Sequence, residues 1–234
     1  MSESPMVATL MATRCRRMLV LVGLLFVAPA LIAADLSVIE YLEGDVRIES
    51  QGRRTVADFG TTLSPGDLLI TGDDGVAIVR VSASSQIKLR ENTVVAIDDV
   101  AGGGSVELRQ GGLFARAQRT ATGRRFQVRT PTVVAGVRGT DFFVAYGRTV
   151  EDRPDLWLCV NTGSVEVLIP RTGDVTVVNE GEGVNILAGL RTTQPRFYPW
   201  TLELNWNFDP AEGEVRDTTD LDGAYADLLD QDYD

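Results

Sequence analysis

Short apolar–polar alternations, separated by glycine-rich turns, run from Val38 to about Leu190 and limit what this chain can fold into. In each alternating run the apolar residues lie two apart, which is the period of a β-strand with one buried face. Turn signals recur about every 8 to 12 residues, and helical periodicity of any length is absent. The clearest runs are DVRIE, VAIVRV, QIKLR, SVELR, RFQVR and SVEVLI. This pattern predicts an all-β domain.

A glycine followed by a short valine-containing strand recurs along this region. It occurs at Gly44, Gly104, Gly163 and Gly173, and the first three are spaced by 60 and 59 residues. Such a spacing suggests a chain that winds back to the same position. We therefore expect a rolled or solenoid-like pair of sheets built from many short strands, rather than a plain hairpin meander.

The N-terminus has the pattern of a secretory signal: a basic segment, an apolar segment and a small-residue end. The basic residues are Arg14, Arg16 and Arg17, and the start is Met1 or Met11. We expect residues 1–34 to be a signal peptide cleaved near Ala30–Ala34, which implies a periplasmic or secreted protein without a stable membrane span. The alternative is an uncleaved anchor helix, although Pro29 interrupts an apolar stretch that is short for a span.

Composition excludes several kinds of chemistry. The chain has no histidine, its only lysine is Lys88, and Cys159 is the single thiol after residue 34. These absences exclude histidine-dependent nucleophilic catalysis, a phosphate-binding P-loop and an intrachain disulfide. From residue 35 onwards the chain has 19 basic and 32 acidic residues, a net charge of −13, which argues against nucleic acid as a partner. We expect no enzyme activity, no cofactor and no metal.

The charge is unevenly distributed. Residues 109–148 contain eight arginines against one acid, Asp141, whereas residues 201–234 have a net charge of −10. The arginines expected to form a basic belt on adjacent strands are Arg116, Arg125, Arg129 and Arg138. Because guanidinium groups pair bidentately with carboxylates and phosphates, the belt is a candidate site for an anionic envelope polymer or an envelope protein. The alternative is that the chain's own acidic residues neutralise it.

One apolar run, TPTVVAGVRGTDFFV (Thr130–Val144), is interrupted by an arginine, a glycine and a carboxylate. The interrupting residues are Arg138, Gly139, Thr140 and Asp141. A charge within a core strand must be paired, so we expect a buried Arg138–Asp141 ion pair that fixes a bulge at Gly139. The alternative is that Arg138 lies at the rim of a binding groove.

The same run resembles the signature of the FecR domain family, in which an apolar strand ends in Val-Arg-Gly-Thr, an acid and Phe. The segments LSPGDLLITGDDGVAIVRV, IKLRENTVVAI, GGSVELRQGGLFARA and NTGSVEVL follow in the family's order, and the resemblance covers about residues 38–189. It implies an extracytoplasmic β domain over residues 35–190, used in some members as a periplasmic sensor that signals to an anti-sigma region. Sensor members carry a longer cytoplasmic segment than the 17 residues that precede the apolar stretch here.

Two further segments follow the predicted domain. Residues 191–209 contain FYPWTLELNWNF, whose clean alternation predicts an amphipathic strand that caps a sheet edge. Its Trp200 and Trp206 could alternatively form an aromatic surface that stacks on sugars. Residues 210–234 are strongly acidic, and we expect a mobile tail.

These observations lead to three hypotheses about function. The first is a non-catalytic periplasmic binding or scaffolding module of the bacterial envelope, which recognises its ligand or partner through the arginine belt. The second is an extracytoplasmic signalling component that works with a separate membrane anti-sigma regulator. The third and weakest is a glycan hydrolase that uses two carboxylates of the pairs Asp73-Asp74 and Asp98-Asp99.

Overall fold

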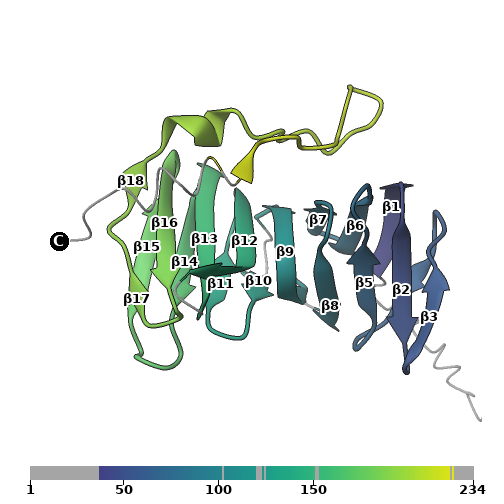
Figure 1. Cartoon of the computed structure of the whole chain (residues 1–234), viewed down its shortest axis with the longest axis horizontal. Coiled ribbons are helices and arrows are strands. Elements are labelled where there is room, and N and C mark those ends of the chain that lie inside the picture. The colour runs from purple at the N-terminus through teal and green to yellow at the C-terminus, as the bar shows by residue number, and fades with distance from the viewer. Residues whose placement is uncertain are drawn as a thin grey trace, which may run out of the picture. The chain divides into compact units, whose positions relative to one another are not determined.

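In this computed structural model the chain forms two sheets, A and B, and passes repeatedly from one to the other (Figure 1). Many consecutive strands pair as hairpins within one sheet. The structure describes residues 37–101, 103–119, 123, 125–150, 153–221 and 223. All of these lie in one unit, Ala34–Asp234. The predicted signal peptide, residues 1–34, and the end of the predicted tail, residues 224–234, lie outside the described residues.

Sheet A takes its strands from nearly the whole length of the described chain. Its spatial order starts at β4 and β1 and ends at β16, which pairs with both β17 and β18. In that order the strands are β4 (Thr62–Leu63), β1 (Ser37–Glu43), β6 (Val76–Ser82), β7 (Ser85–Leu89), β9 (Ser105–Ala117), β12 (Thr140–Val150), β13 (Arg153–Thr162), β16 (Glu182–Leu187), β17 (Arg191–Thr192) and β18 (Arg196–Phe197).

Sheet B lies opposite and shares one long strand, β9, with sheet A. All its neighbouring strands are antiparallel except β9 and β10, which are parallel. In spatial order the strands are β3 (Arg53–Val56), β2 (Val46–Ser50), β5 (Leu68–Thr71), β8 (Val94–Asp99), β9, β10 (Phe126–Arg129), β11 (Val134–Val137), β14 (Ser164–Leu168) and β15 (Val175–Asn179). The predicted all-β, rolled two-sheet fold is confirmed.

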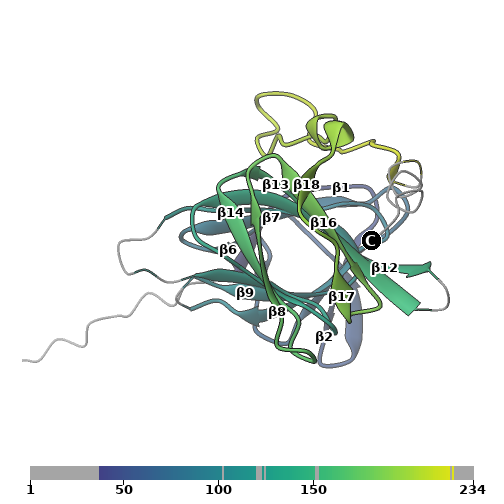
Figure 2. The same cartoon turned by 90° about the vertical axis from the view of Figure 1, so that its left-hand side faces the viewer.

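The two sheets face each other (Figure 2), and the main core lies between their inner faces. Alternate residues of each strand supply it, as the period of two predicts. In β10, for example, Phe126 and Val128 are buried, while Gln127 and Arg129 are exposed. The core is almost entirely aliphatic, with Phe126, Phe142 and Tyr146 as its aromatic members.

Two of the four repeated glycines mark corners where the chain passes from sheet A to sheet B. Gly44 joins β1 to β2, and Gly163 joins β13 to β14. Both have positive φ, and a Cβ on Gly163 would lie 2.5 Å from the Gly139 carbonyl oxygen. Only glycine adopts this conformation without strain and permits such a close approach. Gly104 and Gly173 instead lie in hairpin turns within sheet B. The repeated glycines therefore mark a passage between the sheets at two of their four positions.

A C-terminal segment, residues 198–221, lies across the outer face of sheet A and is called the strap (Figure 1). It starts with a short 3₁₀ helix, η1 (Pro199–Leu202), and contains no strand. A second core fills the space beneath it, where Leu204, Phe208 and Val215 pack on the outer residues of sheet A. The predicted amphipathic strand over these residues is therefore wrong, although they do cover a sheet. Because Val215 and Asp217 are buried, the first part of the predicted mobile tail is packed.

Candidate functional site

Three cations lie on the outer face of sheet A beneath the strap. They are Lys88 in β7, Arg90 directly after it, and Arg116 in β9. The alternation that directs Ile87 and Leu89 into the main core directs Lys88 and Arg90 to the opposite face. This face is otherwise aromatic and aliphatic, with Phe114 directly opposite Lys88 in the register. Each cation therefore needs hydrogen-bond acceptors, and the strap supplies them.

Lys88 is 1% exposed and fastens the middle of the strap. Its Nζ donates hydrogen bonds to the carbonyl oxygens of Asn205 (2.6 Å) and Asn207 (2.8 Å). It also lies 4.4 Å from the centre of the Phe114 ring, within reach of a cation–π interaction. Burial of this ammonium lowers its pKa to about 8, and the nearby cations Arg116 and Arg90 act in the same direction, against Asp217.

Arg116 joins the strap to the start of β12. Its Nε donates to Asp141 Oδ2 (3.0 Å), and its Nη2 donates to the Trp206 carbonyl oxygen (3.3 Å). The guanidinium carbon lies 4.5 Å from the centre of the Phe208 ring. Asp141 is thus the partner of Arg116 across two paired strands, in which the two residues are direct neighbours.

Arg90 joins the sheet to the far end of the strap. Its Nη2 donates to Glu91 Oε1 (2.9 Å) and to the Thr219 carbonyl oxygen (3.1 Å), and its Nε lies 3.4 Å from Asp217 Oδ2. Asp217 is buried, and its Oδ1 accepts from the Asn205 N–H, which closes the strap on itself. Arg90 is 7% exposed, yet its Nη1 has no hydrogen-bond partner among the described residues.

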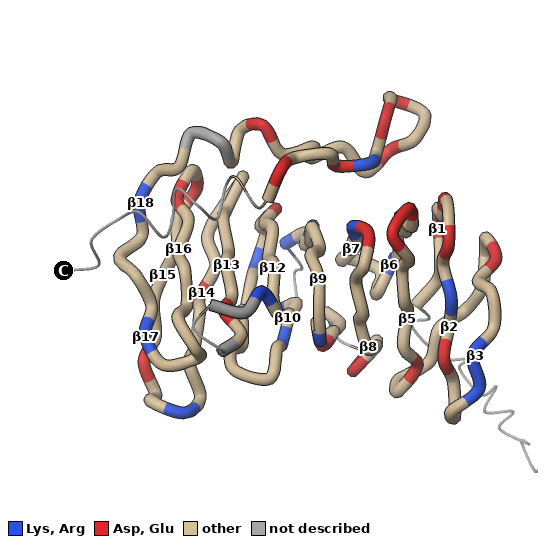
Figure 3. The backbone as a smooth tube through the Cα atoms, viewed as in Figure 1, with Lys and Arg blue, Asp and Glu red and all other residues tan. Residues whose placement is uncertain are grey.

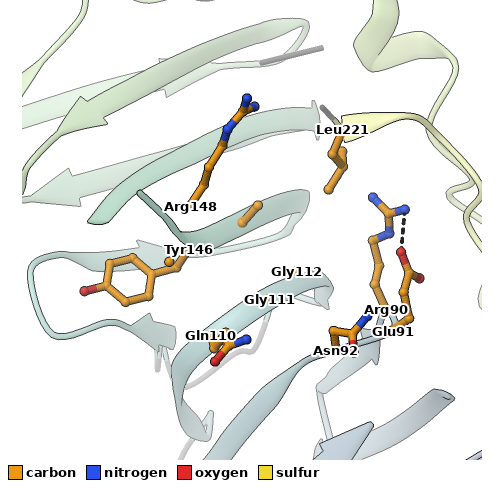
Figure 4. A pocket seen from close by; sticks show the side chains of 11 residues that line it. Arg90, Glu91, Asn92, Gln110, Gly111, Gly112, Tyr146, Arg148 and Leu221 are labelled. Atoms are coloured by element: carbon orange, nitrogen blue, oxygen red, sulfur yellow. Dashed lines mark hydrogen bonds and ion pairs between the residues drawn. The ribbon is translucent and has the colours of Figure 1, made fainter. Parts of the chain in front are cut away.

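A pocket of about 260 Å³ opens beside Arg90 (Figure 4). Its walls come from the turn after β7, the bend of β9, the outer part of β12 and the strap residue Leu221. Arg90 and Arg148 both line it, together with Glu91, whose carboxylate pairs with Arg90, and with Asn92 and Gln110. Gly111 and Gly147 shape it with positive φ, and the register of β12 against β13 shifts between Tyr146 and Arg148. Bulges of this kind redirect side chains next to functional sites.

The strap's only arginine ties its end to the first strand. Arg216 Nη2 donates to Glu43 Oε1 (2.9 Å) and to the Asp74 carbonyl oxygen (2.8 Å). Tyr41 donates its hydroxyl hydrogen to the other oxygen of Glu43 (2.8 Å). Hydrogen bonds from Tyr41 and then Arg216 lower the pKa of the Glu43 carboxyl, and the bond to Glu43 raises the pKa of Tyr41.

The predicted buried ion pair of Arg138 is wrong. Arg138 is exposed in the turn between β11 and β12, and Asp141 pairs with Arg116 instead. The turn leaves the core at this point, so the guanidinium reaches solvent without crossing apolar surroundings. The rest of the motif is structural: Gly139 has φ of +70°, and the buried Thr140 hydroxyl donates to the Ser164 carbonyl oxygen (2.8 Å). The bulge was expected at Gly139, and the register shift lies instead between Asp141 and Phe142.

The four arginines of the predicted belt are not brought together on adjacent strands. Arg116 lies on the outer face of sheet A, whereas Arg125 and Arg129 flank or end β10 in sheet B. These three arginines each pair with a carboxylate of this chain. Arg116 pairs with Asp141, Arg125 with Glu166 (3.3 Å) and Arg129 with Asp98 (3.0 Å). The alternative, in which the chain's own carboxylates neutralise these arginines, fits this geometry.

The predicted aromatic surface and the carboxylate pairs have other roles. Trp206 is half-buried against Phe114, with ring centres 5.2 Å apart, and its Nε1 donates to the Thr201 carbonyl oxygen. The side chain of Trp200 lies outside the described residues. Asp74 and Asp99 each accept a backbone N–H in a turn, from Asp45 and Ala101, respectively. Asp98 pairs with Arg129, and Asp73 lines a second pocket beneath the end of the strap.

Sequence reasoning missed Lys88, Arg90 and Asp217 as site residues. The signal was present, because QIKLR places the only lysine, and then an arginine, on one face of a strand within an otherwise apolar region. A cation on a face that also carries aromatic residues in neighbouring strands must find acceptors. The acceptors themselves come from residues 117 to 129 positions further along the chain, which no local pattern indicates.

Among the described residues, no group of three or more histidine, cysteine, aspartate or glutamate side chains is arranged to hold a metal ion. No helix in the described part of the chain has the length and apolar character needed to cross a membrane. Cys159 is buried beneath the strap, and this burial raises the pKa of its thiol.

The fold and the site together define an all-β module of two facing sheets whose outer cations bind a C-terminal segment. Residues 67–166 match the family model described as FecR protein. The match runs from just before β5 into β14, and the resemblance seen in the sequence is confirmed over this part of the chain.

Two solved structures of a candidate anti-sigma factor from Parabacteroides distasonis ATCC 8503 are also similar to this chain. Each is 21% identical over 57% of this chain and 61% of that chain, with TM-scores of 0.47 and 0.46. The chain thus spans about three fifths of the length of these structures. No curated protein matched the chain.

Proposed function

We propose that this chain is a non-catalytic FecR-type module exported to the periplasm, where it binds a carboxylate group of a partner protein in the pocket beside Arg90. Support for export comes from the N-terminal sequence pattern. Support for binding comes from one observation: a guanidinium that is more than nine-tenths buried lines a pocket and keeps one nitrogen without a hydrogen-bond partner among the described residues. Buried donors of this kind are rare and favour an acceptor from outside.

The pocket suits a small anionic group rather than a polymer. Its volume of about 260 Å³ accommodates a carboxylate side chain or a chain terminus, and Arg148 contributes a second positive charge. Asn92 and Gln110 add amide groups that can donate to the same oxygens. Arg116, Arg125 and Arg129 pair with carboxylates of this chain, as Arg90 does with Glu91 and Asp217. Arg90 differs from these three in that it is buried and that its Nη1 has no hydrogen-bond partner among the described residues.

A second candidate function is a signalling component that works with a separate membrane anti-sigma regulator. The FecR match over residues 67–166 favours a signalling role. In this hypothesis the carboxylate bound beside Arg90 belongs to that regulator. The two functions share one binding site and differ in what the partner does.

The pocket can be tested with acetylated dipeptides as probes, one with a free C-terminal carboxylate and one with an amide. We expect the backbone amide signals of Gly111 and Gly112 to shift in NMR spectra with the carboxylate probe only. Binding should be at least about five-fold weaker in Arg148→Gln, which loses one charged donor. The matched control Arg129→Gln removes an exposed arginine of sheet B and should bind as the unmodified protein does. Equal shifts with both probes, or equal losses in both variants, would rule out this site.

A further inference from the structure

The large apolar side chains that remain exposed are concentrated at the two ends of the sheets. Val56 and Phe59 lie at the end formed by β3, and Val175, Val177 and Phe197 lie at the end formed by β15 and β18 (Figure 1). Among the described residues, Leu202 in η1 is the one other such side chain. Isolated exposed apolar residues need no explanation, but five of six at the sheet ends indicate surfaces made for contact.

The β15 edge has none of the usual protection against pairing. Its sequence is VTVVN, without a charge, a proline or a bulge, and Val175 and Val177 are 57% and 52% exposed. Within the described residues, β15 has β14 as its one strand partner. The Asn179 N–H at its end is bonded to Glu182 Oε2 (2.8 Å), and the rest of the outer edge has no strand partner. Natural edge strands normally carry charges or prolines that prevent such a strand from pairing with another chain.

The opposite edge of sheet B, β3, has a composition that complements β15. Its sequence is RRTV, and all four residues are exposed. Arg53 and Arg54 open this strand (Figure 3), although Arg54 already pairs with Glu49 of β2 (2.8 Å). The residues that flank β15 are the acids Asp174 and Glu180. The turn before β15 also contains Arg171, and in an antiparallel pairing the start of β3 meets the end of β15, so the complementarity rests on Arg53 and Glu180.

Strand direction also fits. From β3 to β15, sheet B contains seven antiparallel steps and one parallel step, between β9 and β10. An odd number of reversals leaves β15 antiparallel to β3. If a second copy continued sheet B beyond β15, its β3 would therefore meet β15 in antiparallel orientation, which is the more stable pairing.

We propose that copies of this protein associate head to tail, with β15 of one copy pairing with β3 of the next. The occupant of the β15 edge is a second copy, because a two-fold β15–β15 pair centred on Val177 would place Asp174 of one copy opposite Glu180 of the other. Since the two surfaces differ, the contact is heterologous and does not close in a dimer. This association uses edges remote in the fold from the Arg90 pocket, so each proposal can fail without the other.

Sedimentation velocity over a concentration series tests the assembly with variants that block one end each. The variant Val177→Lys places a charge on β15, and the double variant Arg53→Glu, Val56→Glu reverses the charge of β3. We expect the unmodified protein to grow beyond a dimer with concentration and each blocked variant to remain monomeric. An equimolar mixture of the two should stop at the dimer, because one intact end of each kind remains. Added salt should weaken the association.

The control Gln127→Lys adds the same charge to β10 in the middle of sheet B and should assemble as the unmodified protein does. Three results would overturn the proposal. These are a monomer throughout the series, growth of the blocked variants as large as that of the unmodified protein, or a mixture that forms no dimer. A two-fold dimer would also be recognised, since the β3 variant would then dimerise on its own. Circular dichroism spectra of all variants establish that each is folded.

Discussion

Lys88 shows how one side chain can connect two parts of the chain that are more than a hundred residues apart. Its ammonium group is buried among aromatic rings and bonded to two carbonyl oxygens of the strap. Burial disfavours the charged form, which explains why its pKa falls to about 8. In the unfolded chain the same group titrates near 10.5.

Because Lys88 is the only lysine, its side-chain NMR signal is a single reporter, and we expect its titration midpoint near pH 8. Between pH 8 and 10.5 the unfolded chain binds a proton that the folded chain has released. The contribution of Lys88 to the free energy of unfolding should therefore rise with pH across this window and be lowest below pH 8. A midpoint near 10.5 in the folded protein would contradict the burial of this charge. The urea-unfolded protein provides the reference titration.

The FecR motif provides a second prediction at the scale of single residues. Thr140→Val removes a buried hydroxyl that donates to the Ser164 carbonyl oxygen, and should lower the free energy of unfolding by about 1–2 kcal/mol. Arg138→Ala, in the adjacent exposed turn, should change it by less than about 0.5 kcal/mol. Urea denaturation measures both. If Arg138→Ala lowered the free energy of unfolding more than Thr140→Val, Arg138 and not Thr140 would be the residue that stabilises this motif.

At the scale of elements, the strap shows how residues with a regular strand pattern can form no strand. Leu204, Trp206 and Phe208 do face the same way, as the alternation indicates, with Leu204 and Phe208 buried and Trp206 half-buried. An extended segment that lies flat on a sheet face has the same period of two as a paired strand. The strap's backbone carbonyls bond to cations rather than to a neighbouring strand. Period alone therefore does not separate the two cases.

The strap should contribute strongly to stability through one aromatic side chain. Phe208→Ala should lower the free energy of unfolding by about 3–5 kcal/mol, because it empties a packed position between sheet A and the strap. It should also expose Lys88 to amine-reactive reagents, which mass spectrometry detects as labelling of that residue. Leu202→Ala, at a position 68% exposed, is the matched control and should change neither quantity. Unchanged labelling in Phe208→Ala would show that the strap does not depend on this contact.

The strands themselves were predictable, and the site was not. RFQVR and SVEVLI form β10 and β14 because every second residue enters the core between the sheets. Arg90 and Asp217, by contrast, meet only because the strap returns across sheet A. Nothing in the residues around either one indicates its partner. The belt prediction failed for a related reason, since charge density along the sequence does not show which sheet receives each strand.

At the scale of the whole molecule, one long strand, β9, belongs to both sheets and connects them without a loop. Residues 105–110 of β9 pair in sheet B, and residues 111–117 pair in sheet A. Several pairings, such as β1–β6, β9–β12 and β11–β14, join strands that are not consecutive in the sequence. Folding of such topologies takes milliseconds to seconds, because long loops must close first.

We expect both sheets and the strap to unfold in one transition. Trp157 and Trp206 report on sheet A and the strap through fluorescence, and circular dichroism reports on all strands. Because β9 belongs to both sheets, neither can separate while the other stays folded, so the two thermal curves should coincide. A fluorescence midpoint clearly below the circular dichroism midpoint would show that the strap and sheet A open first.

The shared strand also sets a limit on tolerated insertions. A single residue added near Gly111 would turn every later side chain of β9 to the opposite face, so that Phe114 and Arg116 would enter the aliphatic interior while Leu113 and Ala115 faced the strap. The register of β9 thus determines which of its side chains face the main core and which face the strap. An insertion there should lower the free energy of unfolding far more than an insertion in the turn at residues 171–173.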